Sequence, residues 1–141
     1  MSDPVEASIA AALLAHLATF AAAQSPVISI AQPNVVFTPQ AQETFLEPFI
    51  LPAQTVNVGI SDQSSTEIPG IFQVTIVAPS GGGIMNAMRI AGSLVEAFER
   101  DTVLLRDGVT VKVDGRPTIS PSLQESERLR LPVRVRYYAL I

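Results

Sequence analysis

The sequence predicts an α+β fold, in which a largely antiparallel β-sheet has two α-helices packed on one face. An alanine-rich helix pattern opens the chain, and a second helix pattern follows a three-glycine loop near its middle. Short runs of alternating apolar and polar residues fill most of the remainder, as is typical of half-buried strands. Because no repeat, low-complexity tail or linker interrupts this order, we expect a single domain over residues 1–141.

The first helix is predicted to begin within Ser2–Glu6 and to end near Pro26. Asp3 is a suitable cap, Pro4 suits the first helical position, and Glu6 stands where a capping-box acid belongs. One apolar stripe then follows, made of Val5, Ile9, Ala12, Leu13, His16, Leu17 and Phe20. The start is acidic, unlike that of a signal peptide. The stretch is also predicted to be too short and too polar to span a membrane, so we expect a cytoplasmic origin.

Shorter patterns predict the strands before the middle of the chain. Apolar runs at Val27–Ala31 and Val35–Phe37 precede a strand over Thr44–Leu51. Pro48 lies inside that strand, which favours a sheet edge or a bulge. Thr55–Ile60 alternates weakly and is expected to be extended.

The clearest strand and the clearest helix lie within Gly70–Arg100. The polar segment Ser61–Pro69 precedes them and is predicted to be a loop or hairpin tip. Ile71–Ala78 alternates as a strand buried on one side. After the glycine loop, the period becomes helical. The apolar stripe of this helix is Ile84, Ala87, Met88, Ala91, Leu94, Val95 and Phe98. Because so short a loop joins them, we expect strand and helix to pack on each other.

The remaining elements are predicted to be extended. Val103–Arg106 suggests a short strand or an extended turn, and Asp107-Gly108 is a strong hairpin signal before the alternating stretch Val109–Val113. Thr118–Leu123 contains Pro121 and is expected to be extended and irregular.

The last strand, Arg128–Ile141, alternates most regularly. Its apolar face carries Leu129, Leu131, Val133, Val135, Tyr137 and Ala139, and its other face carries Arg128, Arg130, Arg134 and Arg136. Pro132 interrupts the basic face, which predicts an edge or a bulge in the first half. Neighbouring arginines on one strand face are about 7 Å apart. Three interpretations stay open for this row: a solvated sheet face, a contact with another subunit or partner, or a loose contact with DNA.

The sequence contains no arrangement typical of catalysis or cofactor binding. Without Cys and with one His, it lacks disulfides, thiolate metal sites and a credible Ser–His–Asp triad. His16 lies on an apolar stripe and is predicted to have a packing role. Gly81, Gly82 and Gly83 are not followed by the Lys and hydroxyl of a phosphate loop. We expect this loop to serve backbone geometry or close approach by a neighbouring subunit, and we expect no enzyme activity and no cofactor.

Charge is distributed unevenly along the chain. The net charge is −4, yet the first 99 residues hold eight acidic side chains against one basic, whereas the remainder holds five acidic against eight basic. Such asymmetry suits copies that pair with one another, or it simply keeps separate faces soluble.

Several pieces in order resemble the tail terminator, or tail completion, proteins of long-tailed bacteriophages. They are the N-terminal alanine-rich helix, FTP at 37–39, LPA at 51–53, GIFQVTIVAPSGGG at 70–83, GVTVKV at 108–113, ISPSLQE at 119–125 and RLPVRVRYY at 130–138. Each piece alone is weak, but together they cover nearly the whole chain. The motifs are structural, so the resemblance transfers no single site residue.

The resemblance implies a structural role. Proteins of this family typically form a ring of six subunits. The ring caps the tail tube, stops its polymerisation and presents the surface for head–tail joining. It implies a place in the virion tail at the head-proximal end after assembly in the host cytoplasm. The implied partners are further copies, the tail tube protein and the head–tail connector protein, with DNA only passing through the channel and no membrane.

On this view the arginine row faces a neighbouring subunit or the channel. Asp62, Glu67 and the three glycines are candidate contact loops. Two alternatives are a different neck or head-completion protein and a small cytoplasmic α+β ligand-binding or enzyme domain. The latter would require a deep apolar pocket with convergent polar groups.

Overall fold

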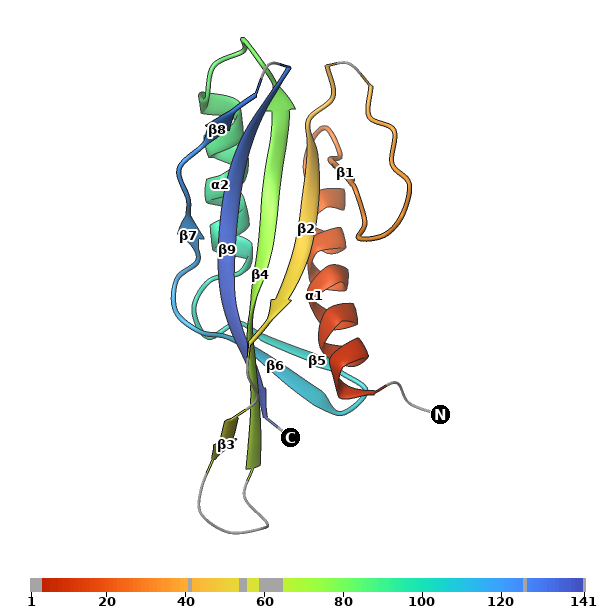
Figure 1. Ribbon diagram of the computed structural model, residues 1–141, viewed down its shortest axis with the longest axis vertical. Coiled ribbons are helices and arrows are strands. Elements are labelled where there is room, and N and C mark those ends of the chain that lie inside the picture. The colour runs from red at the N-terminus through yellow and green to blue at the C-terminus, as the bar shows by residue number, and fades with distance from the viewer. Residues whose placement is uncertain (1–3, 41, 54–55, 59–64, 126, 141) are drawn as a thin grey trace.

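The computed structural model describes residues 4–40, 42–53, 56–58, 65–125 and 127–140 (Figure 1). The helices and strands are α1 (Val5–Ala22), β1 (Ser29–Ile30), β2 (Phe45–Pro52), β3 (Val56–Val58), β4 (Ser65–Pro79), α2 (Met85–Ala97), β5 (Val103–Arg106), β6 (Val109–Val113), β7 (Thr118–Ile119), β8 (Leu123–Gln124) and β9 (Arg128–Leu140).

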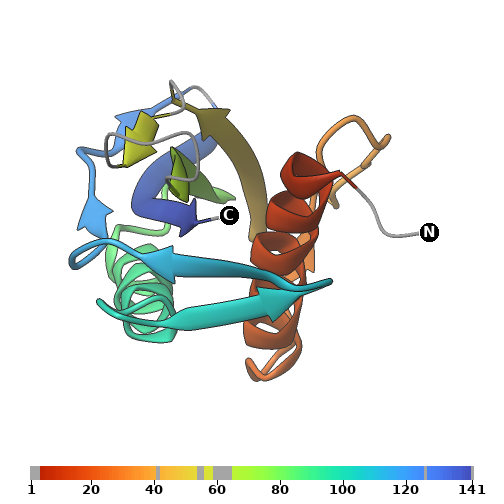
Figure 2. The ribbon, with the colours of Figure 1, turned by 90° about the horizontal axis from the view of Figure 1, so that it is seen from below.

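Within the described residues, nine strands form one sheet with the order β1-β2-β4-β9-β6-β5. β3 pairs with β4, and β7 and β8 pair with β9. All pairings are antiparallel except the short parallel contact between β1 and β2. Both helices lie on the same side of this sheet (Figure 2). The predicted α+β class is therefore confirmed.

The centre of the sheet is the pair β4–β9, which runs from Glu67 opposite Leu140 to Pro79 opposite Arg128. The prediction that residues 65–69 form a loop is wrong, because β4 already begins at Ser65. Cross-strand pairing with the end of β9 and with β3 makes this polar stretch extended. Residues 59–64 lie outside the described residues.

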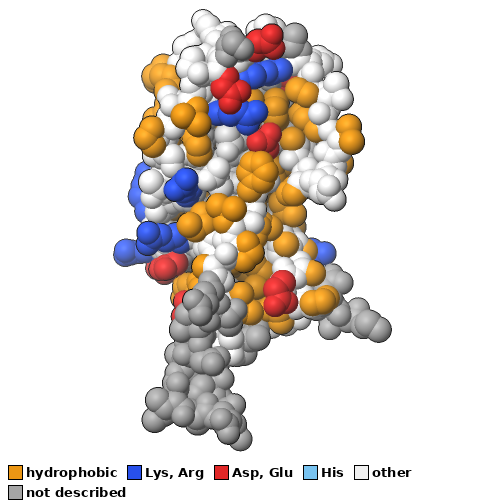
Figure 3. Space-filling view, in the orientation of Figure 1, with side chains coloured by type: hydrophobic (Ala, Val, Ile, Leu, Met, Phe, Trp, Pro, Cys, Tyr) orange, Lys and Arg blue, Asp and Glu red, His pale blue; other side chains and the backbone are white. Residues whose placement is uncertain are grey.

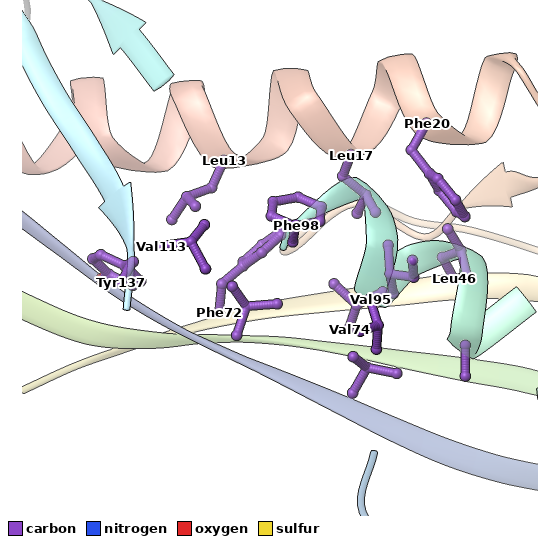
Figure 4. Packing of buried hydrophobic residues seen from close by; sticks show 14 of the residues in the cluster. Leu13, Leu17, Phe20, Leu46, Phe72, Val74, Val95, Phe98, Val113 and Tyr137 are labelled. Atoms are coloured by element: carbon purple, nitrogen blue, oxygen red, sulfur yellow. The ribbon is translucent and has the colours of Figure 1, made fainter. Parts of the chain in front are cut away.

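The core lies between the two helices and the sheet (Figure 4). Leu13, Leu17 and Phe20 of α1 meet Leu46 of β2 and Phe72 of β4 in one buried cluster. α2 contributes its buried Ala87, Ala91, Leu94 and Val95, followed by Phe98. The inward residues of β9 complete the cluster: Leu129, Leu131, Val133, Val135, Tyr137 and Ala139. The apolar face predicted for the last strand is thus buried in full.

The helix ends differ slightly from the prediction. Pro4 is the N-cap of α1 rather than its first helical residue, and Asp3 lies outside the described residues. α2 begins at Met85, and its predicted stripe is too wide, because Ile84 and Met88 are exposed. A helix face in contact with a sheet takes up only a fraction of the circumference, so the side chains at the stripe's margin remain in solvent.

α1 has 18 residues and is long and apolar enough, by length and composition, to cross a membrane. The prediction that this stretch is too short and too polar for a span is therefore wrong. In the structure 39% of the helix is buried inside the molecule. Its apolar stripe packs on the sheet, which accounts for the hydrophobic sequence without a lipid environment.

The predicted hairpin is confirmed at Asp107-Gly108, which joins β5 to β6. Both residues have positive φ, 50° and 79°, as a type I′ turn requires. Thr118–Leu123 is extended and irregular, as predicted: it holds β7 and the start of β8, each two residues long and each paired with β9.

Two of the strand prolines, Pro48 and Pro132, lie where a missing N–H costs little. Pro48 is in β2, which has β1 as a neighbour only at Phe45 and Leu46 and is otherwise an edge, as predicted. Pro132 is in the interior strand β9 and so is not at the predicted sheet edge. It lies opposite the break between β7 and β8, where only its carbonyl is used, by the Ser120 amide at 2.8 Å.

Candidate functional site

The arginine row lies on the sheet face that points away from the helices, here called the outer face (Figure 3). Cross-strand register places Phe49 of β2, Gln73 of β4 and Arg134 of β9 in one line across this face. Leu51, Ile71 and Arg136 form the next line. Towards the glycine loop the lines contain Phe45 with Val77, and Glu47 with Thr75.

The half of the outer face near the glycine loop is covered by residues 31–40 and 42–44, here called the covering segment. Phe37 packs on Phe45 with ring centroids 5.0 Å apart, and Val77 and Thr75 are buried beneath this region. Arg128 fixes the segment. Its guanidinium donates to the carbonyls of Glu43 at 2.7 Å and Gln40 at 3.0 Å. The same group lies 5.6 Å above the Phe45 ring, so Arg128 is engaged within its own chain.

Arg130 is also engaged within the chain. Its guanidinium is 3.1 Å from a Glu47 carboxylate oxygen and 3.0 Å from one of Glu125. The Arg130 and Glu47 side chains are only 29% and 27% exposed, so water screens this pair less than an open surface pair. Arg128 and Arg130 are therefore placed to hold the fold together rather than to meet a partner.

Glu43 anchors the same segment from its other side. Its carboxylate accepts hydrogen bonds from the Ser29 hydroxyl at 2.7 Å and from the backbone N–H of Gln40 at 3.1 Å. The Ser29 bond, followed by the Gln40 bond and the charge of Arg128, lowers the pKa of Glu43 below its usual value.

Arg134 and Arg136 lie on the other, uncovered half of the outer face. Both side chains are exposed, and Arg134 donates only to the neutral Gln73 amide oxygen, at 3.1 Å. Across the described residues, Arg136 makes no ion pair. With Arg116 they line a groove of about 410 Å³ that holds one acid, Asp114. This groove has excess positive charge and suits carboxylate groups.

An apolar strip adjoins this basic groove. Phe49 is 43% exposed and Leu51 is 47% exposed, and the half-buried Ile71 lies between them and the arginines. Figure 3 shows the strip as orange atoms below the charged cluster at the top of the molecule. Exposed apolar side chains next to unpaired cations are typical of a contact surface. We call Phe49, Leu51, Ile71, Arg134 and Arg136 the outer-face patch.

The other predicted contact residues do not join this patch. Gly81, Gly82 and Gly83 form an exposed turn after β4, whereas the half-buried Glu67 lies near the opposite end of the same strand. Asp62 lies outside the described residues. Gly81 and Gly83 have φ of 90° and 78°, which explains glycine at these two positions by backbone geometry.

No cluster suited to catalysis emerges from the residues described. His16, whose packing role was predicted, bonds the Ala97 carbonyl at 2.7 Å and packs edge-on against Phe98. A cavity of about 620 Å³ lies beside the end of α1 and the start of α2, lined mostly by amides and hydroxyls together with Glu43 and Arg89. In the described stretches of the chain, no group of three metal-binding side chains comes together.

Sequence reasoning treated the four arginines as one row and missed that they divide into two pairs. The division arises because the covering segment, residues 31–40 and 42–44, lies over only one region of the sheet, and its Gln40 and Glu43 carbonyls accept from Arg128. Main-chain acceptors leave no signal in a side-chain pattern. The ion pair of Arg130 with Glu47 can be predicted only when the register of the strands is known, and the sequence alone does not give that register.

Comparisons with known proteins agree with this geometry. A family model for phage tail terminator proteins matches residues 8–137. One solved structure is similar to this chain, with 26% sequence identity and a TM-score of 0.79, over 95% of this chain and 94% of its own. No curated protein matches. Because the family model spans nearly the whole fold, including both helices and the outer-face patch, the chain belongs to the phage tail terminator family, whose members are structural proteins of the virion tail.

Proposed function

We propose that this chain is the subunit of a six-membered ring that caps the finished tail tube at its head-proximal end. The ring stops polymerisation of the tube protein and offers the surface to which the head–tail connector protein joins. The family match over residues 8–137 is the observation that carries this proposal. Assembly takes place in the host cytoplasm, before the tail joins the head.

The role is one of contact rather than chemistry. It requires no catalysis, no cofactor and no membrane, and DNA only passes through the channel. The outer-face patch supports it, because a ring subunit needs exposed apolar and charged surface to meet its neighbours. The uneven charge along the chain supports it further, since acidic and basic surfaces on one subunit can meet around a closed ring.

Growth of tail tubes in vitro tests the proposal. Purified tube protein is polymerised from short seeds, the chain is added, and a second, labelled batch of tube protein follows. We expect electron microscopy to show label at one end only, and a ring on the unlabelled end. The matched control is the same chain after heat unfolding, which should leave both ends growing. Label at both ends in the presence of folded chain would overturn the proposal.

A further inference from the structure

The exposed face of α2 is unusual in composition. Met85 is 60% exposed, and Met88 is exposed one turn further on. Glu96 is exposed in the last turn of the same face, and Glu99 is exposed two residues beyond the end of the helix at Ala97. The face thus has an apolar half and an acidic half, with Arg89 at the boundary. Helix faces that simply meet water carry mixed charges and few large apolar side chains.

Gly92 lies between these two halves. Glycine is among the least favourable residues for a helix interior, because it loses the most backbone freedom on folding. A Cβ added at Gly92 would meet nothing within 4 Å, so packing inside this chain does not require glycine there. A glycine at such a position leaves room for another backbone to approach closely.

The outer-face patch has the matching pattern in the same order. Phe49 and Leu51 form its apolar half on β2, and Arg134 and Arg136 form its basic half on β9, with β4 between them. Two inter-strand steps span about 10 Å, and the long arginine side chains extend the patch further. The α2 face from Met85 to Glu96 spans about 17 Å along the helix axis. The backbone width of the patch is thus shorter than the α2 face, and the arginine side chains make up part of the difference. The apolar halves of the two surfaces face each other when the acids meet the arginines.

We propose that the α2 face of one subunit docks on the outer-face patch of the next copy. Met85 and Met88 cover the apolar strip, while Glu96 and Glu99 pair with Arg134 and Arg136. Gly92 lets the helix approach the neighbouring sheet. The two surfaces lie on opposite sides of one subunit, so the contact is heterologous and continues from copy to copy until a ring closes. This inference rests on the proposed ring and names the surfaces that build it.

Charge reversal with restoration tests the pairing. Arg134→Glu with Arg136→Glu, and Glu96→Arg with Glu99→Arg, should each weaken self-association at least tenfold, measured by sedimentation velocity at low salt in the presence of short tube seeds. All four changes combined should recover at least half of the assembled fraction, because the charges again oppose each other. Failure of the combined variant to recover, while each pair still weakens assembly, would overturn the pairing.

Exposed charges outside the two surfaces provide matched controls. Arg106→Glu in the β5–β6 hairpin and Glu6→Arg at the start of α1 change charge in the same directions. Both should leave assembly unchanged. If these controls weaken assembly as much as the paired reversals do, the effect is one of net charge and the inference fails.

Gly92→Ala provides a test in which the stability of the free subunit and its self-association should change in opposite directions. The substitution should raise the melting temperature of the free subunit by about 4 °C, because alanine favours the helix. It should also weaken self-association at least fivefold, because a methyl group holds the neighbour away. A stabilised subunit that assembles as well as wild type would overturn the close approach.

These outcomes separate the inference from the proposed function. If wild-type rings cap tubes and every variant assembles as well as wild type, the pairing is refuted and the capping role remains intact. A wild-type chain that never associates, even on tube ends, would refute both. If the arginine reversals reduce binding of the chain to double-stranded DNA without changing assembly, the patch faces DNA and the pairing is wrong.

Discussion

Gly70 shows how a single residue fixes the central strand pair. It lies opposite Tyr137 across β4 and β9, and a Cβ at this position would overlap the Tyr137 phenol ring. Tyr137 is buried among the core residues, so its ring has little room to move, and the same burial raises the pKa of its phenol. The glycine is therefore a packing requirement rather than a turn.

Gly70→Ala should destabilise the subunit by about 1–3 kcal/mol, the usual cost of overpacking a core. Chemical denaturation monitored by circular dichroism measures the change. Gly82→Ala is the matched control, because an added Cβ at Gly82 meets nothing within 4 Å and its φ is not left-handed. An equal loss of stability in both variants would show that the Tyr137 contact is not the cause.

Glu43 makes stability depend on pH in a defined direction. Its folded pKa lies below the ordinary value of 4.5, mainly because of the Ser29 hydrogen bond. The unfolded chain therefore takes up the proton at higher pH than the folded chain does. The contribution of Glu43 is fully present above pH 4.5 and is lost as pH falls through the lowered folded pKa.

Glu43→Gln should flatten the fall of stability below pH 4.5, because glutamine has no proton to gain. Urea unfolding at a series of pH values measures the slope. Glu6→Gln is the control, since that side chain is exposed in the first turn of α1 and should leave the slope unchanged. A Glu43→Gln slope equal to wild type would contradict the assigned hydrogen bonds.

At the scale of elements, His16 joins the two helices. Its Nε2–H donates to the Ala97 carbonyl at the end of α2, where no basic residue lies in the last turn. Its ring meets Phe98 edge-on with centroids 4.7 Å apart. The histidine therefore satisfies an orphan carbonyl and orients α2 against α1.

His16→Phe should keep the ring contact and lose the hydrogen bond, at a cost of about 1 kcal/mol. His16→Ala should cost more, because it also removes the ring and leaves a cavity. Thermal melts of the two variants measure the difference. Thr19→Ala, on the exposed side of the same helix, controls for general effects on α1. Identical melting temperatures for the Phe and Ala variants would show that the ring adds nothing.

The long elements were predictable because their patterns are long. α1, α2 and β9 each carry a periodic stripe over more than ten residues, and only their margins differ from expectation. β7 and β8 are two residues long, too short for any period to appear. The start of β4 was missed because polar residues there are extended by their cross-strand partners rather than by their own preference.

At the scale of the whole molecule, the sequence indicated that charge is segregated, but not which charged side chains are engaged within the chain and which are exposed. The covering segment, residues 31–40 and 42–44, lies over one half of the outer face and engages Arg128. Arg130 pairs with Glu47, which leaves Arg134 and Arg136 exposed. Which sheet region a connecting segment covers depends on tertiary packing. The sequence therefore predicted a basic face, and only the fold separates its structural pair from its exposed pair.

The edge of β2 has a consequence for aggregation. Leu46 directs its carbonyl outward to the Ala31 amide, at 2.8 Å, so alternate residues of β2 present their backbone to the free edge. Pro48 and Pro52 share this orientation and have no N–H. Between Leu46 and Pro52, Ile50 alone offers a donor there. A strand from another copy would find few donors for a regular ladder along this edge, which opposes uncontrolled sheet growth and amyloid-like aggregation.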